Sequence, residues 1–270
     1  MNELTIVIVS FNARDDLAAC LASLRAHPPS VSHEIVVVDN ASEDGSVDAA
    51  RAVAGVTVIP LERNVGFAAA NNAGIRATRG ELVLLLNSDT IVPAGAIDAL
   101  VARLRRDPSI GVAGPRLIDG SGTPELSFGR MIHPRHEFNR KMTLRWIDKG
   151  SEGALAWLRN ETSREAFVDW VTGACLLVRR RDAESAGLLD ERFFLYTEDV
   201  DFCHSIRMLG RKILFTPVAT VTHLRGRSRA SHPAASQAMY RASHDAFYAK
   251  HYPTVYRRLL RLYLRLKGER

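Results

Sequence analysis

The first part of the chain alternates between short apolar runs and segments whose apolar residues recur at helical spacing. The apolar runs are rich in β-branched residues and predict strands over 4–9, 34–39, 56–60 and 81–86. Spacings of three and four residues predict helices over 14–26, 45–53, 67–78 and 94–106. Strands that alternate with helices of this length are typical of βαβ units, so we expect an α/β fold with a mostly parallel central sheet.

The regular pattern fades between residues 116 and 166, which are rich in Gly, Pro, Arg and His, with one helix predicted near 151–160. We interpret this segment as an insertion over the sheet edge. Regular structure then resumes, and the predicted elements are a strand-like run over 167–179 interrupted by Gly173, helices over 180–186 and 198–209, and short strands over 212–215 and 219–222. We therefore predict one domain over 1–230 and a basic helical extension over 231–270.

Composition narrows the class of protein. The chain has 270 residues, of which 46% are hydrophobic and 24% charged, as expected for a soluble globular protein. Its net charge of +6 favours an anionic partner, such as a nucleotide diphosphate, a phospholipid headgroup or a nucleic acid. The three cysteines show no metal-ligand spacing, and we find neither a signal peptide nor an apolar run of about 20 residues. These features predict a cytoplasmic protein with reduced thiols.

A small polar cluster, Asn87-Ser88-Asp89, ends the apolar run 82–86. Ligands of open α/β sheets bind at the carboxyl ends of the strands. A carboxylate there is a hard oxygen ligand of the kind that Mg²⁺ or Mn²⁺ prefers. Any strand end can carry such a trio, so the cluster alone leaves the metal site open.

Polar residues also follow the first two strands, at Ser10, Asn12 and Asp39. Asp39 can accept the imide N–H of a pyrimidine or a ribose hydroxyl, or it can cap the turn that follows. The residues alone do not choose between these two roles. A G-x-G-x-x-G loop is absent after the first strand, which argues against a nicotinamide or flavin enzyme.

The segment from Asn64 to Asn71 places Gly66 and several small residues at the opening of a predicted helix. This arrangement lets a ligand approach backbone N–H groups closely, although an ordinary turn with a helix cap would look the same.

A second acidic cluster, Glu198, Asp199 and Asp201, lies at a predicted helix start, where the helix dipole also favours carboxylates. Asp199 and Asp201 point in different directions at helical spacing, and a carboxylate here can deprotonate a hydroxyl. His223 follows the last predicted strands as a candidate metal ligand, although a lone loop histidine is more often a surface residue. The helix predicted over 256–267 either packs on the domain or rests on anionic lipid.

In this order, the motifs resemble those of glycosyltransferase family 2, the inverting enzymes of GT-A type, and most of all its bacterial rhamnosyltransferase-like members. The matching segments are 9–12, 38–46, 64–71, 86–89, 172–174, 194–201 and 223–228. The resemblance covers roughly residues 4–230 and excludes 116–165 and the C-terminal extension. It implies a nucleotide-sugar-binding half over 1–115 and an acceptor and catalytic half over 167–230.

The resemblance also implies roles for single residues. Asp199 would be the catalytic base, Asp89 would bind the metal ion, Mg²⁺ or Mn²⁺, and His223 would complete its coordination. The nucleotide would contact a set at the strand ends and the helix opening: Ser10, Asn12, Asp39, Asn64, Gly66, Asn71, Asn87 and Ser88. The acceptor would contact Glu198, Trp170, Thr172 and Gly173, and the diphosphate would contact Arg225 and Arg227.

Two positions depart from the family pattern. Ser205 stands where many relatives carry arginine, and Asn87-Ser88 replaces acidic residues of the commoner metal motif. Asp89 is therefore the only carboxylate of this motif.

Together these features predict a metal-dependent inverting glycosyltransferase. The expected donor is a dTDP- or UDP-sugar, with rhamnose favoured, and the expected acceptor is a glycan or a polyprenyl-linked intermediate at the inner face of the membrane. A sugar-nucleotide nucleotidyltransferase would need a Gly-rich phosphate loop after the first strand, which is missing. A non-catalytic binder of membrane surfaces or nucleic acid remains an alternative because of the positive charge, but we expect no nucleic-acid partner.

Overall fold

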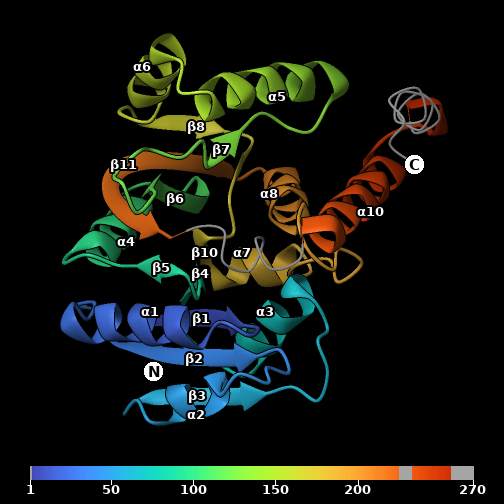
Figure 1. Ribbon diagram of the computed structural model, residues 1–270. Coiled ribbons are helices and arrows are strands. Elements are labelled where there is room, and N and C mark those ends of the chain that lie inside the picture. The colour runs from blue at the N-terminus through green and yellow to red at the C-terminus, as the bar shows by residue number, and fades with distance from the viewer. Residues whose placement is uncertain (1, 225–232, 257–270) are drawn as a thin grey trace.

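The computed structural model describes residues 2–224 and 233–256. In this part of the chain, nine strands form one sheet in the order β3-β2-β1-β4-β10-β6-β11-β5, with β8 paired to β11, and β7 and β9 form a small second sheet (Figure 1). The strands are β1 Leu4–Ser10, β2 His33–Asp39, β3 Val56–Pro60, β4 Leu82–Asn87, β5 Thr90–Ile91, β6 Ile110–Ile118, β7 Phe128–Gly129, β8 Ala166–Val168, β9 Trp170–Val171, β10 Cys175–Arg179 and β11 Lys212–His223. The helices are α1 Arg14–Ala26, α2 Ser46–Arg51, α3 Phe67–Arg76, α4 Ala96–Arg106, α5 Pro134–Asp148, α6 Glu152–Glu161, α7 Arg180–Ser185, α8 Glu198–Met208 and α10 Pro233–His251.

The direction of the strands decides where the site can form. β1, β2, β3 and β4 pair in parallel, and β11 pairs in parallel with β6. β10 lies between β4 and β6 and runs antiparallel to both. Six strands therefore end at one edge of the sheet, and β10 begins at that same edge. The prediction of a mostly parallel central sheet is confirmed.

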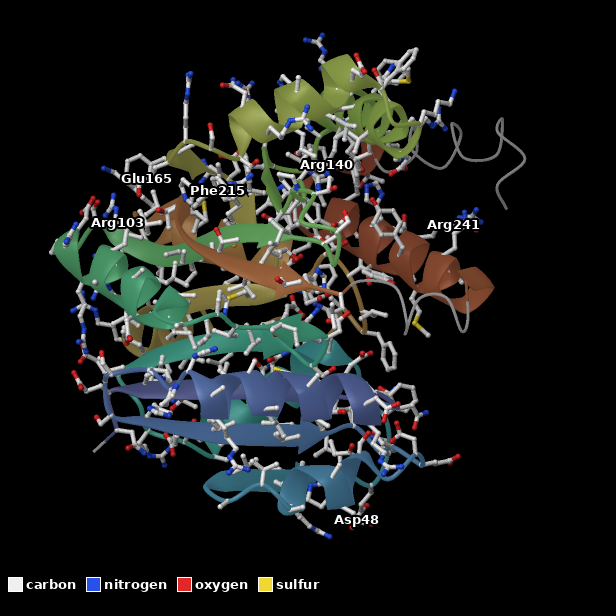
Figure 2. All side chains as sticks on the ribbon, turned by 60° about the vertical axis from the view of Figure 1, so that its left-hand side comes forward. Asp48, Arg103, Arg140, Glu165, Phe215 and Arg241 are labelled. Atoms are coloured by element: carbon white, nitrogen blue, oxygen red, sulfur yellow. The ribbon has the colours of Figure 1, made fainter. Side chains whose placement is uncertain are left out.

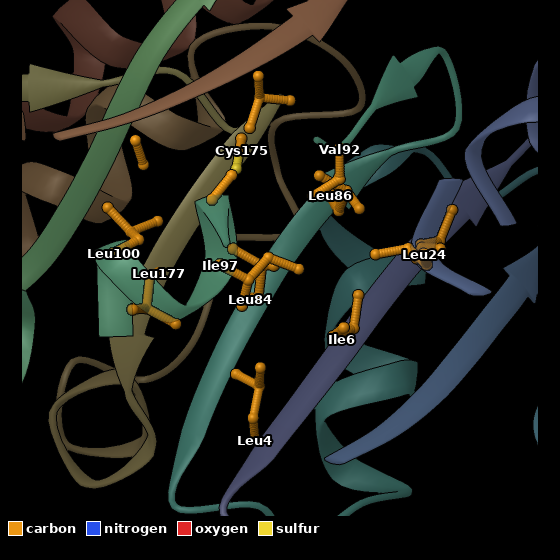
Figure 3. Packing of buried hydrophobic residues seen from close by; sticks show 14 of the residues in the cluster. Leu4, Ile6, Leu24, Leu84, Leu86, Val92, Ile97, Leu100, Cys175 and Leu177 are labelled. Atoms are coloured by element: carbon orange, nitrogen blue, oxygen red, sulfur yellow. The ribbon is translucent and has the colours of Figure 1, made fainter. Parts of the chain in front are cut away.

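The sheet is buried on both faces, which explains why its strands are continuous apolar runs. Ile6 and Ile8 of β1 belong to one apolar cluster with Leu21 of α1 and Leu100 of α4, and Figure 3 shows part of this cluster. The alternate residues of β1 face a second cluster, which includes residues of α3, α7 and α8. Two apolar layers thus fix the strand ends rigidly.

Four elements escaped the sequence patterns: the two-residue strands β5 and β7, the long strand β6 and the helix α5. β6 carries Gly111, Gly114 and Pro115, which weaken a strand signal. α5 has no buried residue, so it lacks the apolar stripe by which a helix is recognised. The two strands predicted over 212–215 and 219–222 are in fact one strand, β11, whose register shifts between Thr216 and Thr220.

α10 contacts the domain through buried Phe247 and through polar groups. The Ser243 hydroxyl donates to the Leu195 carbonyl over 2.8 Å, and the Lys250 ammonium contacts Asp201 Oδ2 over 2.8 Å. Residues 243–252 of the predicted extension therefore pack on the domain, whereas most of the helix predicted over 256–267 lies outside the described residues. Among the described residues, no helix is both long enough and apolar enough to span a bilayer. The boundaries drawn from sequence, at 115, 166 and 230, stay predictions.

Candidate active site

The sheet register brings the predicted donor residues together. Ser10 at the end of β1 pairs with Asp39 at the end of β2, and Val9 pairs with Asn87 at the end of β4. The Asn87 backbone N–H donates to the carbonyl of Ala174, just before β10, over 2.9 Å. Segments that are remote in sequence, around residues 10, 39, 87 and 174, thus meet at one edge.

Several side-chain oxygens at this edge have unmet hydrogen-bonding capacity. Ser10 Oγ, Asp39 Oδ1 and Asn87 Oδ1 are buried and have no hydrogen-bond partner within the described part of the chain. The other oxygen of Asp39 accepts from the Ser42 backbone N–H over 2.8 Å, so this carboxylate caps the turn. Both alternatives for Asp39 therefore fit the geometry: one oxygen holds the turn, and the other remains for a ligand that donates a hydrogen bond.

Asp89 and His223 lie side by side. His223 Nε2 is 3.2 Å from Asp89 Oδ1, and the Leu224 backbone N–H donates to the Asp89 carbonyl over 2.8 Å. β5, which joins the Asn87–Asp89 motif to β11, pairs Thr90 with His223 and so sets this approach. The two predicted metal ligands, 134 residues apart in sequence (223 − 89), are neighbours.

Sequence reasoning missed the partner on the other side of His223. Glu125 is buried, and its Oε2 lies 3.2 Å from His223 Nδ1. Burial alone would lower the pKa of His223, but the hydrogen bonds with Asp89 and Glu125 outweigh it and raise that pKa to about 9. Glu125 lies in the irregular segment after residue 116, where no motif or periodicity marks it.

Asp199 lies on the far side of the β10 start. Its Oδ2 accepts from the Gly173 backbone N–H over 3.0 Å, and its Oδ1 accepts from the Val200 N–H over 2.8 Å. Burial raises the pKa of this carboxyl above its usual range, and the two backbone N–H groups oppose that rise. Gly173 directly precedes Ala174, whose carbonyl bonds to Asn87. These two residues therefore connect the predicted base to the edge where the donor is predicted to bind.

The loop before α8 is held in an unusual conformation. Tyr196 and Thr197 both have positive φ, at 69° and 72°. Non-glycine residues in this region cost about 1–2 kcal/mol each, and such strain is concentrated at functional sites. The same loop is bonded to the start of α3, because the Phe194 carbonyl accepts from the Phe67 backbone N–H over 2.7 Å.

Gly66 makes that contact possible. Its φ is 87°, and a Cβ on it would lie 2.4 Å from the Phe194 carbonyl oxygen. Asn64 Oδ1 accepts from the Gly66 N–H over 3.0 Å and from the Asn40 side chain over 2.8 Å, so the donor loop is itself braced. Glycine is required here by backbone conformation and by space together.

The acceptor residues predicted from sequence lie between Asp199 and the insertion. Trp170 is buried, and its indole N–H donates to the Arg130 carbonyl over 2.8 Å. Thr172 bonds to the Ser127 carbonyl through its backbone N–H, over 2.8 Å, and its side chain contacts Asp199. Residues 170–173 therefore form a border beside the predicted base.

The remaining predicted residues differ in their placement. Asn12 braces the loop after β2, where its Oδ1 accepts from the Glu43 N–H over 2.8 Å. Asn71 is buried and donates to the Phe67 carbonyl within α3, over 2.9 Å. Ser88 is partly exposed between Asn87 and Asp89. Arg225 and Arg227 lie outside the described residues.

Asp201, two residues after the predicted base, serves another purpose. It is buried, and its two oxygens contact Lys250 over 2.8 Å and His251 over 2.6 Å, both on α10. The expectation that Asp199 and Asp201 point in different directions agrees with these contacts. One carboxylate faces the sheet edge and the other fixes α10.

Comparisons with known proteins decide the family. The model described as Glycosyl transferase family 2 matches residues 5–167, more than half of the chain. An N-acetylglucosaminyl-diphospho-decaprenol L-rhamnosyltransferase of Mycobacterium tuberculosis is 32% identical over 97% of this chain and 89% of its own length. The chain belongs to glycosyltransferase family 2.

Further relatives agree with this assignment. A low-salt glycan biosynthesis hexosyltransferase of Haloferax volcanii is 26% identical over 77% of this chain and 62% of its own. The mannosyltransferase PcManGT of Pyrobaculum calidifontis, solved with GDP-Man and Mn²⁺, superposes with a TM-score of 0.64 at 19% identity, over 96% of this chain and 68% of that one. GalNAc-T7, solved with UDP, GalNAc and Mn²⁺, gives 0.62 at 19% identity, over 83% and 43%. The likeness shows a GT-A fold, and the protein is a glycosyltransferase.

In this glycosyltransferase, Glu198 gives a testable consequence of burial. Burial and the neighbouring Asp199 raise the pKa of Glu198 well above its ordinary value of 4.5, and its Oε2 has no hydrogen-bond partner among the described residues. Below pH 4.5 the side chain is protonated in both folded and unfolded chains, so its burial does not lower the free energy of unfolding. As the pH rises above 4.5, Glu198 ionises readily only in the unfolded chain, so the free energy of unfolding falls.

We therefore expect Glu198→Gln to raise the melting temperature at pH 7–8 and to leave it unchanged below pH 4.5. About 1 kcal/mol changes Tm by roughly 2–4 °C in a domain of this size, so a rise of a few degrees is expected. Thermal melts across this pH range measure it, with the exposed Glu62→Gln as control. Equal stability of the Glu198 variant and wild type at every pH would contradict the burial argument.

Proposed function

We propose that this protein is a metal-dependent inverting glycosyltransferase that moves rhamnose from a nucleotide-diphosphate donor to a hydroxyl of a lipid-linked glycan. One observation carries the proposal: the two residues before β10 contact both the donor motif and the predicted base. The Asn87 N–H, two residues before the Asp89 that pairs with His223, donates to the Ala174 carbonyl, and the Gly173 N–H donates to Asp199. The name of the Mycobacterium tuberculosis relative, a decaprenol-linked rhamnosyltransferase, supports this choice of sugar and acceptor.

The nucleotide would bind at the ends of β1 and β2. Ser10 Oγ and Asp39 Oδ1 are buried oxygens at these ends that have no hydrogen-bond partner among the described residues. A base or ribose that donates hydrogen bonds supplies what they lack, since an unsatisfied buried polar group costs about 1–3 kcal/mol. A dTDP- or UDP-linked donor fits this requirement through its imide N–H.

The residues present fit a divalent cation that is shared with the substrate. Within the described residues, no group of three or more His, Cys, Asp or Glu side chains is arranged to hold a metal ion. Asp89 and His223 supply one oxygen and one nitrogen, so the other ligands would come from the donor diphosphate, as is usual for Mg²⁺ and Mn²⁺ sites. Such an ion, when bound, neutralises charge on the departing diphosphate. The mixed oxygen and nitrogen set favours Mn²⁺ over Mg²⁺.

The residues on the acceptor side would perform the proton transfer. Asp199 has both oxygens oriented by backbone N–H groups, and its raised pKa makes it a better base than an exposed aspartate. It would accept the proton of the acceptor hydroxyl as that oxygen bonds to the anomeric carbon. The bond from the anomeric carbon to the diphosphate breaks on the opposite face, so the configuration inverts in one displacement.

A panel of nucleotide sugars tests the donor assignment. Thermal stabilisation of the full chain is measured with dTDP-rhamnose, other dTDP- and UDP-sugars, and GDP-mannose, each with and without Mn²⁺. We expect the largest rise in melting temperature with dTDP-rhamnose and Mn²⁺ together. If only GDP-mannose raised the melting temperature, the donor assignment would be wrong. If the rise with dTDP-rhamnose were the same without Mn²⁺, the metal assignment would be wrong.

Glu125 should act as a positioning residue for His223. A carboxylate on the far nitrogen of a metal-binding histidine fixes its tautomer, and the loss of such a partner costs about 10–100-fold in metal affinity or activity. We expect Glu125→Ala to raise the Mn²⁺ concentration needed for half-maximal transfer by that factor and to leave the donor KM at saturating Mn²⁺ nearly unchanged.

Glu125→Gln keeps a hydrogen-bond acceptor for the His223 ring and should recover most of the loss. A merely structural role would instead lower stability in both variants without moving the Mn²⁺ titration. This comparison separates positioning from packing.

The alternatives from sequence find less support. A sugar-nucleotide nucleotidyltransferase is disfavoured by family membership, and no observation favours a non-catalytic nucleic-acid binder. A cytoplasmic location at the inner membrane face follows as a proposal from the lipid-linked acceptor.

A further inference from the structure

The insertion helix α5 presents an outward face that the proposed reaction does not use. Phe138 and Trp146 are 62% and 52% exposed there. Phe138, Lys141, Arg145 and Lys149 follow one another three or four residues apart, so they share one side of the helix. All of them are exposed.

The charge of this face is strongly one-sided. Arg135 adds a fourth exposed cation, and Asp148 is the only exposed acid of α5, at the edge of the face. The Lys149 ammonium lies 5.8 Å from the centre of the Trp146 ring. Trp157 of the neighbouring helix α6 is also 40% exposed. Cations are thus interleaved with large aromatic rings.

The opposite side of α5 is fixed to the body of the protein. The Arg140 guanidinium donates to the carbonyls of Leu126 and Phe128 and lies 4.7 Å from the centre of the Trp170 ring. Glu137 contacts His244 and Tyr248 of α10. Figure 2 shows Arg140 between the insertion helices and the rest of the molecule. The cationic and aromatic face therefore cannot turn inward.

We propose that this face of α5 docks the enzyme on an anionic lipid bilayer. Tryptophan and phenylalanine sit at the boundary between headgroups and acyl chains, and cations beside them attract the anionic headgroups. α5 lies at one end of the molecule, a position that suits contact with a planar surface (Figure 1). The orientation also serves the acceptor: Trp170 lies directly beneath Arg140, so a helix diameter of about 10 Å separates the bilayer from the predicted acceptor border. Only this last point rests on the proposed function.

Binding of the full chain to vesicles tests the docking surface. Vesicles of phosphatidylcholine mixed with phosphatidylglycerol are sedimented with the protein, and vesicles of phosphatidylcholine alone serve as the comparison. We expect binding to the anionic vesicles that weakens at high salt. Lys141→Gln/Arg145→Gln/Lys149→Gln should weaken it about a hundredfold, because each surface cation contributes roughly fivefold. Phe138→Ser/Trp146→Ser should weaken it about tenfold even at high salt.

Matched variants on other surfaces control for charge and hydrophobicity. Arg25→Gln/Arg51→Gln/Arg106→Gln removes the same charge from exposed positions on α1, α2 and α4. Met208→Ser/Val218→Ser removes two apolar side chains that are 74% and 55% exposed. Both should bind vesicles like wild type. The C-terminal tail is present in every variant, so its contribution cancels. Equal losses in the α5 and control variants would overturn the proposal, as would retention on nucleic acid without vesicle binding.

A second readout separates this inference from the proposed function. The α5 variants should transfer sugar normally to a short water-soluble acceptor and lose transfer to a lipid-linked acceptor embedded in vesicles. Asp199→Asn should bind vesicles like wild type. Absence of transfer by every protein, with vesicle binding still dependent on α5, would refute the proposed function and leave the docking surface standing.

Discussion

Asp199→Asn should reduce sugar transfer by about 10²–10⁴-fold, the usual contribution of a general base, while the nucleotide sugar still binds. Asparagine keeps the size of the side chain and an oxygen for one of the two backbone N–H groups, that of Gly173 or that of Val200, so most of the loop geometry should persist. What it loses is the ability to accept the acceptor proton. The measurement is kcat with saturating donor and acceptor, together with calorimetric binding of the donor.

Wild-type enzyme should also show an acid limb in its pH profile above the ordinary range for aspartate. Because the base must be ionised, kcat/KM should fall as pH drops through the raised pKa of Asp199. Asp201→Asn is the informative control. It removes the partner of Lys250 and His251, which should cost about 1.5–3 kcal/mol of stability but leave kcat per folded molecule intact. Turnover near wild type in Asp199→Asn would refute the assignment of the base.

Asp89→Ala should remove metal-dependent donor binding and lower kcat/KM by about 10³-fold or more, since stabilisation of a leaving diphosphate is worth several kcal/mol. The effect should be large because Asp89 is the only carboxylate of its motif. His223 would remain held by Glu125 over 3.2 Å, so the fold of the edge should survive.

Titration of Mn²⁺ against donor affinity measures this loss directly. Wild type should bind the nucleotide sugar more tightly as Mn²⁺ is added, and Asp89→Ala should show no such dependence. Asp48→Asn, at an exposed position on α2, provides the matched removal of one negative charge and should behave as wild type. If donor affinity still rose with Mn²⁺ in the Asp89→Ala variant, the ion would bind at a site other than Asp89.

The sequence predicted the first four strands of the fold well for a physical reason. β1, β2 and β4 are buried on both faces, so their apolar runs are unbroken, and the polar residues that end them stand out. Ser10, Asp39 and Asp89 could each be found at such an end. Their proximity then followed from the parallel direction of the strands.

The rest depended on pairings that no local pattern encodes. The antiparallel course of β10 brings Gly173 to the donor edge, yet its run resembles any buried strand. Glu125 is placed by the irregular chain after β6, and its role depends wholly on a contact with His223, 98 residues away. α5 is held by polar contacts such as those of Arg140 and not by an apolar stripe, so no apolar periodicity in the sequence predicts it.

The packing of Gly66 against the Phe194 carbonyl connects the loop that we propose binds the donor to the loop that precedes the proposed base. If the donor orders the Gly66 loop, the Phe194 loop is also ordered before the acceptor binds. Thermodynamic reciprocity then requires each substrate to tighten the other by the same factor. The expected kinetic signature is a compulsory sequence, with the nucleotide sugar loading first and the free nucleotide leaving last.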